Sequence, residues 1–318
     1  MVIIKDVLLS KKYVPGKYNI FIIREPKIRV IMSQSIKDKV INHLVAKYIL
    51  INAFDDVLIE ENCATRIKKG TRYALNLFKK YYNILKNKNK VFYILKFDIS
   101  KYFYNIDHLI VKDMIKKRIK DKDAINILNK IIDSTNLSYI NESILKLKDK
   151  YNIKDEIPLY KNDKGFPIGN MTSQIVACFY LNDLDHFIKE KLGIKYYVRY
   201  MDDGVILCDN KDKLKNALIQ IDKFLVNYKL KLNRKTRIYK SSEEIEFLGF
   251  RFSINNKNRI ILKVKNITKN RYKKKITKVN YLYRNDKICY SKYICVKNSY
   301  KAYLKYGSCN RLLLFLNK

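Results

Sequence analysis

Two adjacent carboxylates, Asp202 and Asp203, interrupt the otherwise apolar stretch YYVRYMDDGVILCD at residues 196–209. Two strand-like runs with so short a connection predict a β-hairpin that carries both acids at its tip. Neighbouring carboxylates repel each other, so the tip needs a basic side chain or a metal ion to offset its charge. Since Asp is common in turns, a solvated turn is the alternative.

A third carboxylate, Asp98, directly follows the apolar run VFYILKF at 91–97, which predicts a buried strand that ends at the acid. If this strand lies beside the hairpin in one sheet, the three carboxylates converge. Such a cluster can bind two Mg²⁺ ions, or Mn²⁺ in their place, about 3.5–4 Å apart. One ion activates an attacking hydroxyl and the other stabilises a departing phosphate, which is the chemistry of nucleotidyl transfer.

Apolar spacing and turn residues predict the elements that must position these acids. Asp107 is a candidate N-cap for one helix, and Thr172 or Ser173 for another. A second hairpin is expected at 245–253. Strands and helices alternate without the regular spacing of parallel units, so we expect an α+β fold with helices on one face of the sheet. The expected helices lie at 36–52, 71–85, 108–119, 175–192 and 211–228.

Composition indicates a folded protein with an anionic partner. The chain has 318 residues, and its 47% hydrophobic content is enough for a buried core in one or two domains. Its 67 Lys and Arg against 30 Asp and Glu give a net charge of +37, which favours nucleic acid as the partner. A lysine-rich composition that reflects an AT-rich genome is the alternative source of this charge.

The positive charge is most concentrated in residues 251–318. This segment holds 19 Lys and Arg, a single acid, Asp286, and eight tyrosines. Basic and aromatic side chains in alternation suit contact with phosphates and stacking on bases. A solvated helical face of a lysine-rich protein would have the same composition.

Other functional classes find little support. The six cysteines show no CxxC spacing and there are only three histidines, which argues against a zinc site and for reduced thiols. No run of about 18 apolar residues and no signal-peptide pattern occurs. We therefore expect a cytoplasmic protein that does not bind membranes.

Six motifs, taken in order, resemble those of reverse transcriptases. NCATRIKKGTRYAL is similar to their fingers motif, and FDISKYF, GFPIGNMTSQ, YMDD, LKLNRKT and FLGF are similar to their palm motifs. The resemblance covers residues 20–250 and implies a right-hand polymerase, with an antiparallel palm sheet and a short, basic, helical thumb. It places fingers at 1–90, palm at 91–109 and 165–250, a fingers/palm insertion at 110–164, and the thumb at 251–318.

One group within that family resembles the chain more specifically. Most reverse transcriptases have Pro-Gln-Gly where this chain has Pro167, Ile168 and Gly169, the pattern of diversity-generating retroelements. The stretch SYKAYLKYGSCNRLL at 299–313 is similar to their thumb. This implies error-prone cDNA synthesis on a structured template RNA, with a small basic accessory protein, in a bacterial or phage-infected cell. Alternatives are a defence-associated or abortive-infection reverse transcriptase, a non-catalytic RNA-binding protein with this fold, and a membrane-surface protein.

The resemblance also assigns the reacting groups. The metal ligands would be Asp98, Asp202 and Asp203, with Ile99 at the same site. Lys235 would protonate the departing pyrophosphate as a general acid. A solvated lysine is the alternative for Lys235.

For the incoming deoxynucleoside triphosphate, the resemblance makes Phe103 a steric gate beneath the sugar, with core packing as the alternative. Arg66 and either Lys68 or Lys69 would bind the triphosphate, because Arg matches phosphate oxygens bidentately. Ile168 would loosen fidelity, or merely pack under the fingers. The full set expected at the nucleotide is Arg66, Lys69, Phe103, Ile168, Gly169 and Gln174.

Overall fold

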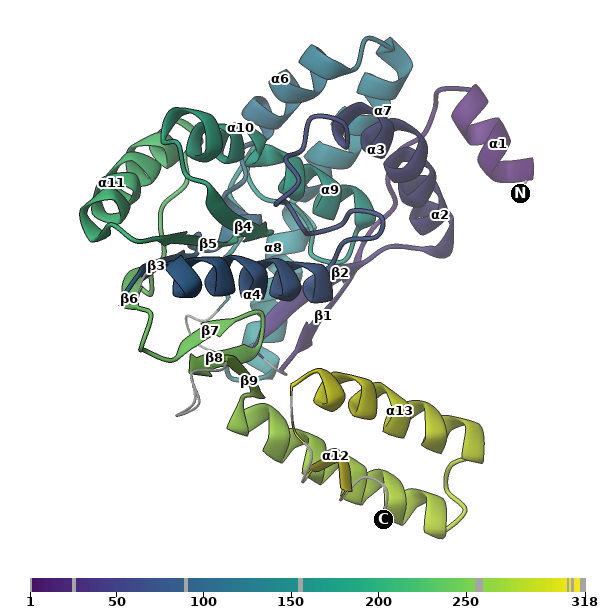
Figure 1. Cartoon of the computed structure of the whole chain (residues 1–318). Helices are drawn as coiled ribbons and strands as arrows, with labels where there is room; N and C mark the ends of the chain where they lie inside the picture. The colour runs from purple at the N-terminus through teal and green to yellow at the C-terminus, as the bar shows by residue number, and fades with distance from the viewer. Residues whose placement is uncertain are drawn as a thin grey trace.

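A four-stranded antiparallel sheet forms the centre of the protein (Figure 1). The computed structural model describes residues 2–24, 27–88, 91–153, 157–254, 260–307, 309 and 312–314. The strand order is β4-β5-β3-β6. Its strands are β3 (Tyr93–Phe97), β4 (Tyr196–Tyr200), β5 (Asp203–Cys208) and β6 (Arg237–Lys240).

The predicted hairpin and the strand before Asp98 are neighbours in this sheet. Tyr200 pairs with Asp203 across the hairpin, and Phe97 of β3 pairs with Gly204 of β5. A Cβ on Gly204 would lie 2.2 Å from the Phe97 ring, so only glycine allows the two strands to approach this closely. Strand pairing therefore places all three acids at one end of the sheet.

Helices cover both faces of the sheet, whereas we expected them on one. Helices α9 (Met171–Tyr180), α10 (Asn182–His186) and α11 (Lys211–Asn227) belong to the core on one face. Helix α4 (Thr71–Lys88) packs Phe78 and Tyr82 into the core of the other face. The physical reason is that successive residues of β3 and β5 are apolar, so neither face can be left to water.

The second predicted hairpin is also present and gains a third strand. It forms the sheet of β7 (Ile245–Phe247), β8 (Phe250–Ile254) and β9 (Ile260–Val264), which shares the core beneath α4. Helices α12 (Asn266–Arg284) and α13 (Tyr290–Tyr306) follow as a pair that projects from the body (Figure 1). Residues 308, 310 and 311 of the motif at 299–313 lie outside the described residues.

The amino-terminal part contains a two-stranded sheet beside a helical layer. It comprises α1 (Val2–Leu9), β1 (Asn19–Ile23) and β2 (Arg29–Ser33). The helix expected at 36–52 is present but changes pitch at a π-helical turn. Its pieces are α2 (Ile36–Val45), the turn η1 (Ala46–Leu50) and α3 (Ile51–Phe54).

The segment between β3 and α9 is helical and was partly predicted. It contains α5 (Tyr102–Asn105), α6 (His108–Arg118), α7 (Lys122–Ile132), the 3₁₀ turn η2 (Asp133–Asn136) and α8 (Ser138–Lys150). Asp107 caps α6 as predicted, because its Oδ1 accepts hydrogen bonds from the Leu109 and Ile110 amides at 3.1 and 3.3 Å.

The predicted cap of α9 is wrong. The helix begins at Met171, so Thr172 and Ser173 lie inside it, and Thr172 Oγ1 donates to Asn42 Oδ1 at 2.6 Å instead. The helix expected at 175–192 is also interrupted at Leu181, after which it continues as α10 and then as the π-helical turn η3 (Phe187–Lys191). Among the described residues, no helix is both long and apolar enough to cross a membrane.

Candidate active site

The structure brings the three predicted carboxylates together at one end of the central sheet. Asp98 follows β3, Asp202 lies in the hairpin turn, and Asp203 begins β5. Burial and the charges of Asp98 and Asp203 raise the pKa of Asp202 from 3.8 to about 7, and its carboxyl group shares a hydrogen bond with that of Asp98. We call these three residues the acidic triad.

A nearby basic side chain offsets the negative charge of Asp203 only in part. Burial raises its pKa, while the nearby ammonium of Lys96, with Nζ 3.7 Å from Oδ1, acts in the opposite direction. The triad therefore consists of hard oxygen donors whose repulsion the protein leaves largely uncompensated. That donor set fits divalent cations such as Mg²⁺, which prefer carboxylate oxygens.

A second cluster of possible metal ligands lies elsewhere. It consists of His108, Asp133 and Asp163, each of which offers one possible ligand atom, and these atoms lie within 4.8 Å of one another. However, Lys112 Nζ is 2.6 Å from Asp133 Oδ1, so an ammonium group already neutralises this carboxylate. The acidic triad is therefore the better candidate for a metal site.

The loop before β6 anchors Asp98 on its other side. The Asn233 amide donates to the Asp98 carbonyl at 2.7 Å, and Asn233 Nδ2 donates to Asp98 Oδ2 at 3.1 Å. Lys235 lies in the same loop, and its exposed ammonium has no partner among the described residues. The side chain of Ile99 is hydrocarbon and packs in the core, so only its main-chain carbonyl oxygen could act as a metal ligand.

A cavity of about 420 Å³ opens beside the triad. Two of the residues predicted at the nucleotide, Phe103 and Ile168, line it together with Asp202 and Asp203. Phe103 is held in place where its carbonyl accepts the Phe166 amide at 2.7 Å. The cavity thus joins an apolar wall to an acidic end.

The turn before α9 packs closely against β2. Gly169 has φ +137°, and a Cβ there would lie 2.9 Å from the Met32 carbonyl oxygen, so glycine is required. The Met32 amide donates to the Ile168 carbonyl at 3.0 Å. Gln174, by contrast, is exposed on α9 and does not line the cavity.

The structure does not bring the predicted triphosphate ligands to this cavity. Arg66 donates from Nε to Asp55 Oδ1 at 2.6 Å and from Nη1 to the Ile59 carbonyl at 2.7 Å. Lys69 donates to the Glu60 carbonyl at 2.7 Å. Lys68 is exposed and has no partner among the described residues. In this conformation Arg66 and Lys69 hold the loop at 55–62, and their role at a triphosphate stays a prediction.

Two other cations line the cavity, and neither was predicted from the sequence. Arg29 lies at the start of β2, and Lys101 has a left-handed backbone with φ +50°. Lys101 stands between Asp98 and Phe103 in the motif FDISKYF, which was a usable signal. Nothing local distinguishes Arg29 from other basic residues, because only the tertiary placement of β2 brings it here.

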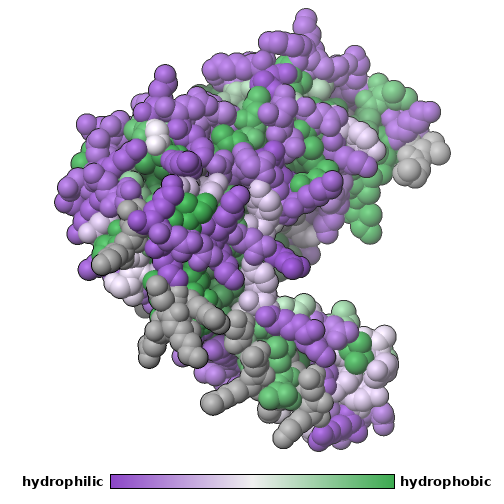
Figure 2. Space-filling model, in the orientation of Figure 1, coloured by the Kyte–Doolittle hydropathy of each residue, from purple (hydrophilic) through white to green (hydrophobic). Residues whose placement is uncertain are grey.

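A larger recess, of about 1160 Å³, lies next to the cavity and shares Arg29 with it. Figure 2 shows the hollow between the body and the helical pair α12–α13. Its polar lining is mostly cationic, with two tyrosines on the helical side. The residues that carry this character are Lys27, Arg29, Lys265, Arg271, Tyr272, Lys274, Lys275, Lys278 and Tyr303.

Residues 17–252, most of the chain, match the family model described as reverse transcriptase (RNA-dependent DNA polymerase). The chain belongs to the reverse transcriptase family. Enzymes of this family are nucleotidyltransferases that use divalent metal ions. No curated protein matches the chain.

Solved structures agree with this reverse transcriptase fold. Apo telomerase from Candida tropicalis, truncated from the C-terminal domain, is similar with a TM-score of 0.55, 16% identity, and coverage of 80% of this chain and 55% of that one. Telomerase from Candida albicans, solved with a TWJ fragment of telomeric RNA, has a TM-score of 0.52, 12% identity, and coverage of 80% and 47%. At such identities the likeness shows the fold alone, and this reverse transcriptase spans about half the length of those chains. The predicted α+β fold class is confirmed.

Proposed function

We propose that the chain is an RNA-directed DNA polymerase that adds deoxynucleotides to a 3′-hydroxyl end with Mg²⁺. The observation that carries this proposal is the acidic triad beside a cavity with an apolar wall and two cations. Asp98, Asp202 and Asp203 would hold the metal ions. When bound, Mg²⁺ lowers the pKa of the attacking hydroxyl and offsets charge on the departing pyrophosphate.

The chain's own side chains would orient the nucleotide. Arg29 and Lys101 face the cavity and would bind the triphosphate oxygens as charge-assisted donors. Phe103 would pack against the sugar and exclude a 2′-hydroxyl. Lys235, exposed in the loop that anchors Asp98, would deliver a proton to the pyrophosphate.

The division into fingers (1–90, with the insertion 110–164), palm (91–109 and 165–250) and thumb (251–318) belongs to this proposal. The basic recess between body and helical pair would hold an RNA–DNA duplex, since cations at its wall match phosphates. The Candida albicans telomerase solved with an RNA fragment supports RNA as a partner of this fold.

More specifically, we propose that this polymerase makes error-prone cDNA for a diversity-generating retroelement. Its support is Ile168, which lines the cavity and brings no polar group there. A structured template RNA and a small basic accessory protein would be the partners. A defence-associated reverse transcriptase is the alternative, because it would share the same site.

Replacing Asp202 and Asp203 together by Ala tests the proposal. We expect deoxynucleotide incorporation with Mg²⁺ to fall by at least about a thousandfold, while RNA affinity in a filter-binding assay changes less than about twofold. Asp222→Asn, an exposed carboxylate on α11, is the matched control. If the double variant retained incorporation, the assignment of the metal ligands would be contradicted. If it lost RNA binding as well as incorporation, the result would indicate a folding defect.

A further inference from the structure

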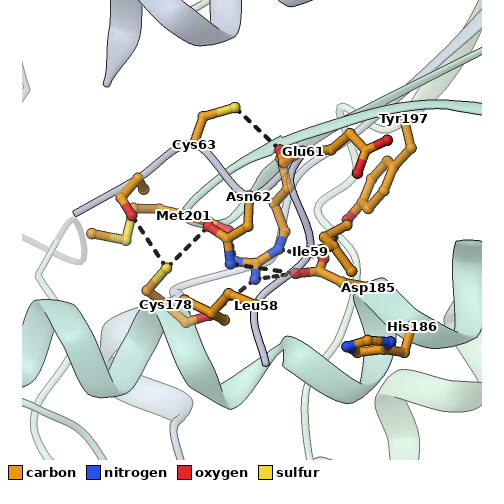
Figure 3. A network of polar contacts seen from close by, with 12 residues as sticks. Leu58, Ile59, Glu61, Asn62, Cys63, Cys178, Asp185, His186, Tyr197 and Met201 are labelled. Carbon is orange, nitrogen blue, oxygen red and sulfur yellow. Dashed lines mark hydrogen bonds and ion pairs between the residues drawn. The ribbon is translucent and has the colours of Figure 1, made fainter. Parts of the chain in front are cut away.

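A fully buried ion pair contacts the hairpin that carries Asp202 and Asp203. Arg199 in β4 and Asp185 in α10 both have side chains with 0% exposure. The pair is bidentate, with Arg199 Nε 2.6 Å from Asp185 Oδ1 and Nη2 2.5 Å from Oδ2. Tyr197 donates its hydroxyl to Asp185 Oδ1 at 2.8 Å, and the network includes Asn62 and Cys178 (Figure 3).

The Arg199 guanidinium also contacts the β4–β5 hairpin that carries Asp202 and Asp203. Its Nη1 donates to the Met201 carbonyl at 2.8 Å, and its Nη2 donates to the Cys178 carbonyl at 2.9 Å. Met201 has φ +56°, a left-handed conformation that a non-glycine residue adopts only with outside support. A bond to the Met201 carbonyl fixes the peptide plane between Met201 and Asp202. The position of the Asp202 backbone therefore depends on Arg199.

Stability alone gives little reason for this arrangement. Removing two charges from water offsets most of their attraction, and packed hydrocarbon of similar volume serves a core as well or better. What hydrocarbon cannot supply is a donor to the Met201 carbonyl. A planar guanidinium presents donors from three separate nitrogens and so reaches Asp185 and Met201 at the same time, whereas an ammonium presents its donors from a single nitrogen.

We propose that Arg199, fixed by Asp185, is a positioning residue that sets the left-handed turn at Met201 and so holds Asp202 within reach of Asp98. This inference rests on the proposed function, since it assigns the triad to metal binding. It concerns the shape of the metal site rather than the stability of the fold.

The test replaces the pair without leaving a buried charge. In Arg199→Met/Asp185→Leu the core stays neutral and filled, but the donor to Met201 is lost. We expect a cooperative circular-dichroism melt at a somewhat lower temperature than the parent, because the buried Tyr197 hydroxyl loses its acceptor. We expect Mn²⁺ affinity by electron paramagnetic resonance to be at least tenfold weaker. We also expect kcat to fall at least thirtyfold with KM for the nucleotide within threefold.

The exposed pair Arg118–Asp56, with Nη2 2.8 Å from Oδ1, supplies the control. Arg118→Met/Asp56→Leu should leave melting, Mn²⁺ affinity and kcat unchanged. A folded Arg199→Met/Asp185→Leu with parental Mn²⁺ affinity and kcat overturns the inference. If that variant does not fold, Arg199→Lys provides the same test of Mn²⁺ affinity and kcat. Lysine has a single nitrogen at the end of its side chain where the guanidinium has three. A parent that binds Mn²⁺ but incorporates no nucleotide would contradict the proposed function and leave the metal-affinity comparison valid.

Discussion

The repulsion within the acidic triad should cost the metal-free protein measurable stability. Burial and two neighbouring carboxylates raise the pKa of Asp202 from 3.8 to about 7 in the folded chain. At 1.36 kcal/mol for each pH unit, this corresponds to a ceiling of about 4 kcal/mol. Asp202 is only half-buried, so water screens part of this energy, and we expect about 1–2 kcal/mol. Asp202→Asn removes the charge and keeps the shape, so it should stabilise the metal-free chain by that amount at pH 7.5.

The sign of the pH dependence follows from linkage. A carboxyl group whose pKa is higher in the folded than in the unfolded state binds its proton more tightly when folded. Its contribution to stability is therefore greatest near pH 4, falls as the pH rises from about 4 to 7, and is constant above that range. Asparagine does not titrate, so the difference between Asp202→Asn and the parent should grow over the same window.

Urea denaturation in EDTA, followed by circular dichroism from pH 4.5 to 8, measures this difference. Mg²⁺ should reverse it, because the parent binds the ion and gains stability while Asp202→Asn gains less. Asp222→Asn, which is exposed on α11, controls for the loss of an acid as such. An Asp202→Asn chain that is less stable than the parent at pH 7.5, or a difference that does not change with pH, would refute the reasoning.

Three further outcomes test the cavity and the recess. Phe103→Ala should lower the preference for dATP over ATP about tenfold in kcat/KM, because the ring no longer fills the space at the sugar; an unchanged ratio would make Phe103 a core residue. Ile168→Gln should give roughly tenfold fewer substitutions at template adenines in sequenced cDNA, and equal error spectra would place fidelity elsewhere. Lys274→Ala/Lys278→Ala should reduce the slope of log affinity for an RNA–DNA duplex against log salt by about 1.4–1.8 with kcat unchanged, whereas an unchanged slope would exclude the recess as the duplex site.

The sequence predicted the acidic triad because its signals are local. An acid at the end of an apolar run, and two acids between two such runs, place carboxylates at strand ends whatever the rest of the chain does. The pairing of Phe97 with Gly204 then brings them together, and the glycine needed for this approach stands directly after Asp203. The prediction that helices cover only one face of the sheet was wrong, because a short apolar strand does not show how many helices cover it.

It was harder to predict which basic side chains line the cavity, for a physical reason. With 67 Lys and Arg in the chain, a basic residue carries little information about its position. Arg29 reaches the cavity only through the packing of β2 against the turn at Gly169, while Arg66 is drawn to Asp55 and the carbonyls around it. Contacts far apart in sequence decide both outcomes.

The distribution of charge around the triad argues for metal ions rather than side chains as its counter-charge. In so basic a chain, an ammonium group for each carboxylate would be easy to supply, yet only Lys96 pairs with the triad among the described residues, 3.7 Å from Asp203. Lys27 and Lys265 lower the pKa of Asp203 from further away. Closer cations would neutralise the acids and compete with a divalent ion. The cations that line the cavity and recess instead surround the triad, where phosphates of a nucleotide and a duplex would need them.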